Sequence, residues 1–219
     1  MPVRARKAGA ETAELPRRLA AGLAVTGWSG LALQLAVSVS LTRAAGDPVA
    51  IGLWRFVGYF TILTNVLVAV AFTRLALARP IAPASFTGRI LAIAIVGVVY
   101  HTILADVVPP TTPAWWLADR VLHYVMPASA VAWWLAFTPK AGLEYRDAVR
   151  WLRYPLSYLA YALLRGAIDG WYPYFFIEAS RLGYARALTN AAALTLAMLV
   201  AGLLLVAVTR FARRLAERR

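Results

Sequence analysis

Six apolar stretches, each close to the length of a membrane-spanning helix, restrict this chain to few folds. A transmembrane helix needs about 20 mostly apolar residues, and here 61% of the 219 residues are hydrophobic while only 15% are charged. The mean hydropathy of +0.64 is too high for a soluble domain. We therefore predict an all-α polytopic membrane protein whose six transmembrane helices cover residues 19–41, 55–77, 90–108, 115–137, 151–168 and 188–208.

Basic tails flank the predicted six-helix domain, which covers residues 19–209. Residues 1–18 carry five Lys or Arg and are expected to be disordered as far as Pro16. Residues 210–219 carry another five. The first apolar run lacks a clear cleavage site followed by a hydrophilic mature domain, so we predict no cleavable signal peptide. The segment 109–113 contains three prolines and is expected to be a loop.

The charge distribution predicts how the chain is oriented. Its net charge is +13, and the basic residues flank the apolar spans, which indicates anionic lipid headgroups rather than nucleic acid as the partner. The tails and the loops at 74–89 and 140–153 hold 17 Lys and Arg, whereas the other three connections hold 6. By the positive-inside rule we expect both termini in the cytoplasm. Because the chain has no cysteine, disulfides and thiolate metal sites are excluded.

The second predicted span begins with an unusually polar stretch. Thr61, Thr64 and Asn65 are spaced by three and four residues, so a helix would carry them on one face. Such a face is expected to contact other helices or a pocket rather than lipid. The simpler interpretation is that these side chains hold helices together, a common use of Thr and Asn in membrane bundles.

His123 is the most informative single residue of the fourth span. Asp119 precedes it by four residues, so the carboxylate can hydrogen-bond the imidazole and hold its tautomer, and a neutral imidazole can accept a proton from a hydroxyl. The alternative is a histidine that only stabilises the bundle. His101, near the end of the third span, is expected to be structural or to support His123. A haem held by the two histidines is a weaker alternative, and we predict no metal site.

The fifth span carries a polar stripe at helical spacing, namely Tyr154, Tyr158, Tyr161, Arg165 and Asp169. The plain interpretation is an interfacial stripe with an Arg165–Asp169 pair. The functional alternative is that Arg165 lies at the mouth of an outer-half pocket and binds an anionic group. The aromatic run at 171–176, which includes Tyr172, is expected to form an interfacial belt or to cover that pocket.

Three motifs resemble the androgen-induced-gene-one family of multispanning membrane proteins, and most closely its bacterial six-span branch. They are Phe60-Thr61 with Asn65, His123 with Pro127, and Arg165 followed by Gly170-Trp171-Tyr172-Pro173-Tyr174-Phe175. Animal members use a membrane-embedded threonine and a histidine to hydrolyse fatty-acid esters of hydroxy fatty acids. The resemblance implies that Thr61, not Thr64, is the nucleophile and that His123 is its partner. It also implies the bacterial inner membrane as the location. One departure is that many bacterial members have an aspartate where Trp133 or Trp134 stands in this sequence.

We therefore expect a membrane hydrolase of a lipid ester that needs no cofactor. His123 would take the proton of Thr61, Thr61 would attack the ester carbonyl, and Asn65 or Thr64 would donate a hydrogen bond to the oxyanion. Arg165 would bind a substrate carboxylate. The alternative is a non-catalytic protein that binds or transports a lipid or small molecule. Transporters often show internal repeats, and the chain shows none, which favours the enzyme.

Overall fold

All regular structure in the described part of the chain is helical. The computed structural model describes the backbone of residues 2–107 and 109–217 and the side chains of residues 14–107 and 109–216. The elements, in chain order, are α1 (Pro2–Ala44), α2 (Val49–Phe56), α3 (Phe60–Ala76), α4 (Pro83–Val99), the π-helix η1 (Tyr100–Leu104), α5 (Pro113–Arg120), the π-helix η2 (Val121–Val125), α6 (Met126–Phe137), α7 (Tyr145–Trp151), α8 (Arg153–Asp169), the 3₁₀ turn η3 (Phe175–Ile177), α9 (Ala179–Leu182) and α10 (Tyr184–Glu217).

Three helical segments are long and apolar enough to cross a bilayer. They are Glu14–Ala44 in α1, Pro83–Leu104 in α4 and η1, and Tyr184–Ala216 in α10. The pair α2 and α3, which is bent by 70°, is a fourth candidate. Large apolar side chains of α10, such as Leu196, Leu204 and Val208, are exposed on the outside of the protein, as lipid contact requires. The all-α class is thus confirmed, and the apolar helices indicate a membrane protein.

The other two predicted spans are less apolar. Residues 115–137 form the run α5–η2–α6, with Asp119, Arg120 and His123 in its first half. The span predicted at 151–168 corresponds to α8, which has only 17 residues and carries the polar stripe. Neither segment is among the candidate spans. The polar side chains of these two segments lower their mean hydropathy, and several of them contact neighbouring elements, as described below.

Some predicted boundaries differ from the observed ones. α1 begins at Pro2, so the backbone of the basic segment that we expected to be disordered is helical. Ala, Glu, Arg and Lys, which dominate this segment, are good helix formers and extend the apolar helix. The segment 109–112 is a loop, as predicted, and Pro113 starts α5. Val108 and the tail residues Arg218 and Arg219 lie outside the described residues.

The second predicted span is broken rather than continuous. α2 ends at Phe56, α3 begins at Phe60, and Gly58 lies in the break. A Cβ atom on Gly58 would come within 2.5 Å of the Trp171 ring and 2.7 Å of the Arg165 guanidinium. Only glycine permits this close approach. The break therefore allows the loop after α8 to pack directly against the backbone between α2 and α3.

The polar stripe of α8 supplies partners for the backbone carbonyls at this break. Three side chains donate hydrogen bonds across the interface: Tyr158 to the Gly58 carbonyl at 2.9 Å, Tyr161 to the Val57 carbonyl at 3.1 Å, and Arg165 to the Trp54 carbonyl at 2.7 Å. Non-helical backbone at membrane depth is tolerated only where protein groups satisfy it. The stripe thus stabilises the bent α2–α3 pair, a role that the sequence analysis did not predict.

Replacing Arg165 with methionine is expected to lower the free energy of unfolding by about 2–4 kcal/mol. Arg165 is 3% exposed, its guanidinium lies 3.8 Å from the Trp54 ring centroid, and it also donates to the Tyr161 hydroxyl at 2.9 Å. Denaturant titration in detergent measures the change. The control is Arg181→Met, which removes an exposed pair with Glu178 at 3.4 Å and should change stability by less than about 1 kcal/mol. Equal effects of the two variants would contradict this structural role.

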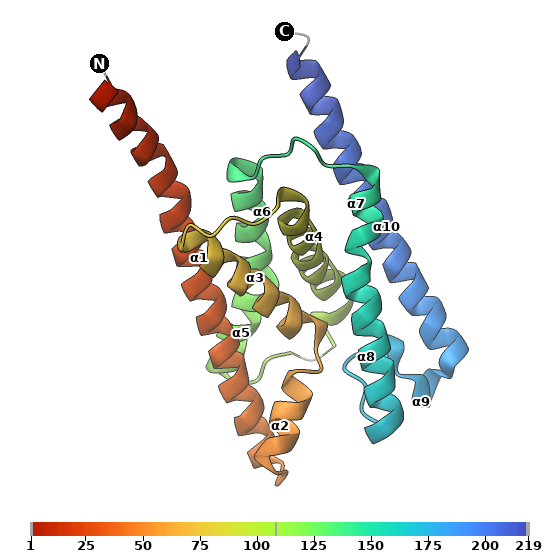
Figure 1. Ribbon diagram of the computed structural model, residues 1–219. Helices are drawn as coiled ribbons and strands as arrows, with labels where there is room; N and C mark the ends of the chain where they lie inside the picture. Colours follow the sequence, from red (N-terminus) through yellow and green to blue (C-terminus); the bar gives the residue numbers. More distant parts are fainter. Residues whose placement is uncertain (1, 108, 218–219) are drawn as a thin grey trace.

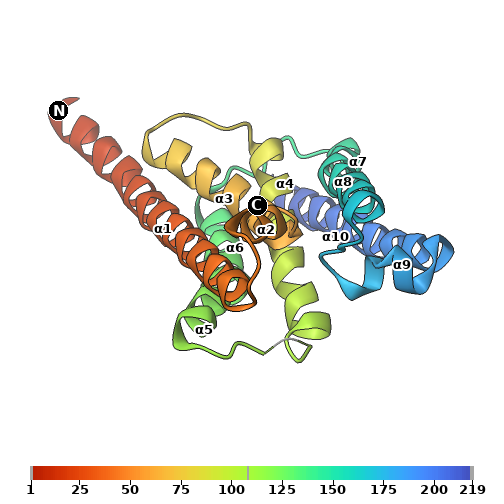
Figure 2. The ribbon, with the colours of Figure 1, turned by 90° about the horizontal axis from the view of Figure 1, so that it is seen from below.

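The helices form a bundle in which α4 and α6 lie between α1 on one side and α8 and α10 on the other (Figures 1 and 2). The start of α1 and the end of α10 point to the same end of the bundle, and α2 and α9 lie at the opposite end (Figure 1). An aromatic cluster of Phe72, Phe86 and Trp133, with ring centroids 5.4 to 5.7 Å apart, fills the core between α3, α4 and α6. Trp134 donates to the Thr87 hydroxyl at 2.9 Å.

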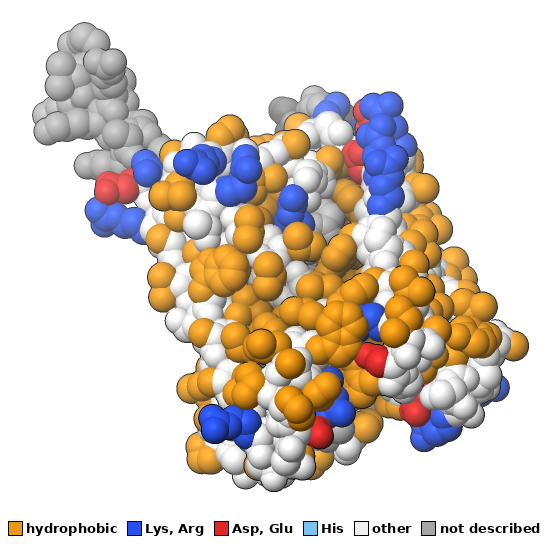
Figure 3. Space-filling view, turned by 60° about the horizontal axis from the view of Figure 1, so that its bottom comes forward, with side chains coloured by type: hydrophobic (Ala, Val, Ile, Leu, Met, Phe, Trp, Pro, Cys, Tyr) orange, Lys and Arg blue, Asp and Glu red, His pale blue; other side chains and the backbone are white. Residues whose placement is uncertain are grey.

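The surface agrees with a membrane environment. In the face shown in Figure 3, hydrophobic side chains cover the middle, and Lys and Arg gather mainly toward the upper and lower borders. Apolar surface of this extent is unfavourable in water and favourable in lipid. Basic side chains at the borders of such a band are placed to meet lipid headgroups.

Candidate functional site

A mainly apolar cavity of about 110 Å³ lies between α3, α4, α8 and α10. Its walls include Ile95, Val99, Leu159 and Leu194, and Thr61 provides one of its few polar groups. Thr61 is the second residue of α3, directly after the break, and is 8% exposed. The bend between α2 and α3 therefore places the predicted nucleophile at the wall of an apolar cavity.

Tyr174 is a polar neighbour of Thr61 at the apolar cavity. It precedes η3, lines the same cavity and accepts a hydrogen bond from the Thr61 backbone N–H at 3.3 Å. Burial raises the pKa of the Tyr174 phenol to about 12, although hydrogen bonding to Thr61 acts in the opposite direction. The phenol is therefore neutral near pH 7 and keeps a proton that it can donate within the cavity. Tyr174 belongs to the aromatic run, but the sequence analysis gave it no role at the site.

The three polar residues of α3 are buried as predicted, but they contact three different neighbours. Thr61, Thr64 and Asn65 are 8%, 1% and 0% exposed. The Thr64 hydroxyl hydrogen-bonds the Tyr154 hydroxyl at 2.8 Å and lines a different cavity from Thr61. Thr64 therefore does not line the cavity at Thr61, where we expected it to donate to an oxyanion.

Asn65 joins α3 to the segment that carries His123. Its amide nitrogen donates to the Thr61 carbonyl at 2.9 Å and to the Leu122 carbonyl at 3.2 Å. Both N–H groups are thus used, so Asn65 has no donor left for an oxyanion. Its side-chain oxygen is buried and has no hydrogen-bond partner among the described residues. Because the Thr61 and Leu122 carbonyl oxygens bond the same nitrogen, they lie no more than about 6 Å apart.

Pro127 explains why the Leu122 carbonyl is available. In η2 the Met126 N–H bonds the Val121 carbonyl, five residues earlier, and Pro127 has no N–H. The Leu122 carbonyl thus has no donor within its own helix and accepts from Asn65 instead. Turns of this π-helical kind occur frequently at functional sites. This one contains His123.

His123 is held by a carboxylate and an aromatic ring. Its Nδ1 lies 3.1 Å from the Asp119 side-chain oxygen Oδ1 and 3.1 Å from the Asp119 carbonyl. The ring stacks on Tyr100 of η1, with centroids 3.8 Å apart. The predicted contact between Asp119 and His123 is confirmed. An Nδ1–H directed at two acceptors leaves Nε2 unprotonated and able to accept a proton.

Thr61 and His123 lie in neighbouring segments, but their side chains are not hydrogen-bonded to each other. Among the described residues, no hydrogen bond joins their side chains, and His123 is not among the residues that line the apolar cavity. Asn65 is the link between the two segments. Proton transfer from Thr61 to His123 therefore requires a side-chain rotation or a bridging water.

The remaining predicted site residues lie elsewhere. His101 is exposed in η1 and its ring centroid lies 6.1 Å from that of Tyr124, whereas the His123 ring stacks on Tyr100. Tyr172 packs against Gly166, where an added Cβ would come within 2.2 Å of its ring. Neither Tyr172 nor Arg165 lines the apolar cavity, and both donor contacts of Arg165 go to protein groups.

Asp169, at the end of α8, makes contacts different from those predicted. Its carboxylate accepts a hydrogen bond from the Trp54 indole at 2.5 Å and from the Trp171 N–H at 2.9 Å. The predicted Arg165–Asp169 ion pair is absent from the salt bridges of the described residues. Trp54 lies between the two groups and bonds both.

The described residues contain no group of three or more His, Cys, Asp or Glu side chains that could hold a metal ion. The candidate site consists of Thr61 and Tyr174 at the apolar cavity and of Asp119 and His123 behind Asn65. Comparison of this chain with models of known protein families, with curated proteins and with solved structures finds no match.

Proposed function

We propose that this protein is an integral membrane hydrolase of a lipid ester, with Thr61 as nucleophile and His123 as base. The observation that carries the proposal is the Asp119–His123 contact at 3.1 Å, buried beside the segment that carries Thr61. A carboxylate that orients a neutral imidazole is the arrangement that activates hydroxyl nucleophiles. On this proposal the chain is a bacterial relative of the androgen-induced-gene-one family and lies in the inner membrane.

The proposed reaction proceeds through an acyl-enzyme. After a side-chain rotation or through a bridging water, His123 Nε2 takes the proton of the Thr61 hydroxyl as the Thr61 oxygen attacks the ester carbonyl. Tyr174 donates a hydrogen bond to the oxyanion. The intermediate collapses, and the leaving alkoxide takes the proton from His123. Water then attacks the acyl-Thr61 ester with His123 again as base, which releases the fatty acid and restores Thr61.

The cavity that Thr61 lines supports a proposal for the substrate class. Its walls are mainly aliphatic and aromatic, which suits an acyl chain, and an apolar chain gains about 0.8 kcal/mol for each buried CH₂ group. We propose a fatty-acid ester, of the hydroxy-fatty-acid type that the family resemblance implies. Arg165 has no part in substrate binding in this proposal, because it does not line the cavity and its two terminal nitrogens donate to Tyr161 and Trp54.

Release of free fatty acid by the purified protein tests the proposal. The full chain would be reconstituted in phosphatidylcholine vesicles with a panel of fatty-acid esters, including esters of hydroxy fatty acids, and the released acid measured by mass spectrometry. We expect hydrolysis of at least one ester above the rate of empty vesicles. Folded protein that hydrolyses none of them would contradict the proposal.

A second candidate function is non-catalytic binding of a lipid. The observation in its favour is that no hydrogen bond joins the side chains of Thr61 and His123 among the described residues. In this case the cavity would hold an acyl chain without cleaving it. Esters that bind to the reconstituted protein but are recovered intact would support this candidate over the hydrolase.

We further propose six membrane crossings with both termini in the cytoplasm. The crossings are α1, the α2–α3 pair, α4 with η1, α5–η2–α6, α8 and α10. Support comes from the shared direction of the two chain ends in Figure 1 and from the excess of Lys and Arg in the tails and in two loops. In this orientation the break between α2 and α3 lies in the outer half of the membrane.

Cysteine labelling tests the orientation, because the chain has no native cysteine. We expect a membrane-impermeant thiol reagent to label Thr111→Cys in intact cells and to leave Ala8→Cys and Ala216→Cys unlabelled until the membrane is opened. Thr111 is exposed in the loop before α5. Labelling of both terminal cysteines in intact cells, with Thr111→Cys protected, would reverse the proposed orientation.

A further inference from the structure

A second cavity, of about 490 Å³, lies where the start of α4 faces α7 and the first turn of α8. Its lining differs in chemistry from that of the cavity at Thr61. Three arginines, Arg89, Arg150 and Arg153, line it together with one carboxylate, Asp147. The charged lining therefore has a net charge of +2, and Arg74 adds a further positive charge near Arg89. No established or proposed role above accounts for this concentration of positive charge.

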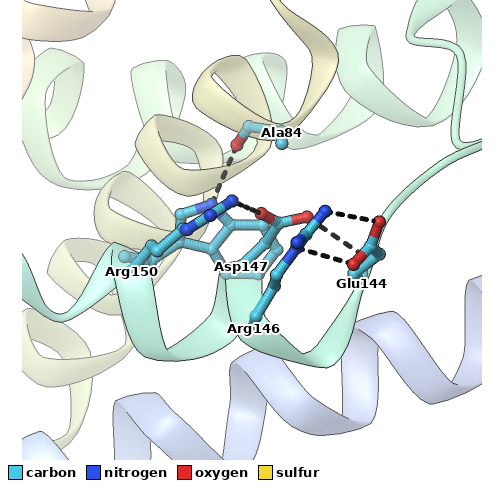
Figure 4. Close-up of polar contacts among 6 residues, drawn as sticks. Ala84, Glu144, Arg146, Asp147 and Arg150 are labelled. Carbon is cyan, nitrogen blue, oxygen red and sulfur yellow. Dashed lines mark hydrogen bonds and ion pairs between the residues drawn. The ribbon is translucent and has the colours of Figure 1, made fainter.

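Figure 4 shows that the single carboxylate is engaged by its own helix. One oxygen of Asp147 accepts the Glu144 backbone N–H at 3.0 Å, and the other accepts from Arg150 at 3.2 Å. Arg146, on the same helix, pairs with Glu144 at 2.6 Å and does not line the cavity. The capping box of α7 thus uses Asp147. The carboxylate can neutralise no more than one of the three arginines in the cavity.

The other two arginines keep donors that are not used by protein acceptors. Arg89 is held in place by its Nη1, which donates to the carbonyl and hydroxyl of Ser85 at 2.9 and 2.8 Å. This leaves its second terminal nitrogen with no hydrogen bond among the described residues. Arg153 is exposed and makes no hydrogen bond or ion pair within the described part of the chain. Fixed and free guanidinium groups around one cavity suit an anion with several oxygens.

The rest of the lining is partly polar and partly apolar. The hydroxyls of Thr64 and Tyr154, which are hydrogen-bonded to each other, line the cavity. Trp151 forms a wall, and its indole donates to the Ala84 carbonyl at 2.8 Å. Gly88 permits this packing, because a Cβ there would come within 2.4 Å of the Trp151 ring. Leu67 and Ala92 add apolar surface. The lining could therefore bind a ligand that has both a charged group and an apolar part.

We propose that this cavity binds the phosphate group of an anionic phospholipid. Two or more arginines around a phosphate form strong charge-assisted hydrogen bonds, and the cavity is on α4, a candidate membrane span. Inorganic phosphate shares the chemistry of the headgroup, so the two sources must be separated by experiment. This inference does not depend on ester hydrolysis at Thr61, because no described residue lines both cavities.

Isothermal titration of the full chain in detergent tests the proposal with dihexanoyl phosphatidic acid, dihexanoyl phosphatidylcholine and inorganic phosphate. We expect phosphatidic acid to bind and phosphatidylcholine to bind at least about tenfold more weakly. Arg153→Gln and Arg89→Gln should each raise the Kd for phosphatidic acid about tenfold or more, since each removes a charge-assisted contact. Arg153→Lys should keep part of the affinity, because it keeps the charge but loses the planar donor pair.

Arg146→Gln is the matched control, because it removes a basic residue of the same surface that does not line the cavity. It should change the Kd by less than about twofold, as long-range charge is screened in buffer. Inorganic phosphate that binds as tightly, with the same dependence on Arg89 and Arg153, would overturn the lipid headgroup as ligand and assign a free anion instead. Equal weakening by Arg146→Gln and Arg153→Gln, or no binding by folded wild-type protein, would overturn the site itself.

Discussion

Thr61→Ala and His123→Ala are each expected to reduce ester hydrolysis to the background rate, a loss of at least about 10⁴-fold in kcat. The hydroxyl is a poor nucleophile without its base, and the base has nothing to activate without the hydroxyl. The double variant should therefore lose no more activity than either single variant. Thr61→Ser, which keeps a hydroxyl at the cavity wall, should retain measurable activity. Fatty-acid release from reconstituted vesicles measures all four variants.

Two control variants separate a catalytic effect from a loss of structure. The Thr102 hydroxyl bonds only the Val98 carbonyl of its own helix, and His101 is exposed beside it. Thr102→Val and His101→Ala should therefore keep activity within about tenfold of wild type, because surface substitutions of this kind cost little. Full activity in Thr61→Ala, or loss in His101→Ala with none in His123→Ala, would contradict the proposed catalytic pair.

Asp119→Asn is expected to lower kcat by about 10³–10⁴-fold with a smaller change in KM. Asp119 is a positioning residue, because it acts on His123 rather than on the substrate. Its carboxylate accepts the Nδ1 proton, whereas the amide of asparagine can donate to Nδ1 and favour the tautomer with the proton on Nε2. That tautomer cannot accept the proton of Thr61. Steady-state kinetics on a soluble short-chain ester separates kcat from KM.

Two further variants, Asp119→Glu and Asp106→Asn, serve as controls for Asp119→Asn. Asp119→Glu keeps the charge and should recover part of kcat. Asp106→Asn should leave kcat unchanged, because Asp106 is exposed in the turn after η1. A purely structural role for Asp119 would lower the yield of folded protein and leave the kcat of the folded fraction near wild type. That result would contradict the assignment of Asp119.

The sequence predicts well those features that depend on hydropathy and local spacing. The length of the apolar runs gives the all-α class, because only helices satisfy the backbone within single apolar segments of this length. The four-residue spacing places Asp119 one turn before His123, and their contact follows directly. The polarity of Thr61, Thr64 and Asn65 correctly predicts that all three are turned away from lipid.

Hydropathy and local spacing do not predict features that depend on contacts between distant segments of the chain. The break at Gly58 has no strong local signal, because it is stabilised by Tyr158, Tyr161 and Arg165, about 100 residues later. The polar stripe on α8 is visible in the sequence, but the sequence does not show that it contacts the break between α2 and α3. For the same reason the contact of Tyr174 with Thr61 was missed. Pro127 was a usable signal for a disturbed helix at His123, but it does not specify that Asn65 fills the free carbonyl.

The most direct test of the central claim is to identify the residue that an activated-hydroxyl probe modifies. Wild-type protein in detergent would be treated with a fluorophosphonate, digested and mapped by mass spectrometry. We predict a single adduct on Thr61, which disappears in His123→Ala and is blocked by a competing fatty-acid ester. An adduct on another residue would contradict the assignment of Thr61. Folded protein that forms no adduct and hydrolyses no ester would contradict the hydrolase and favour a lipid-binding protein.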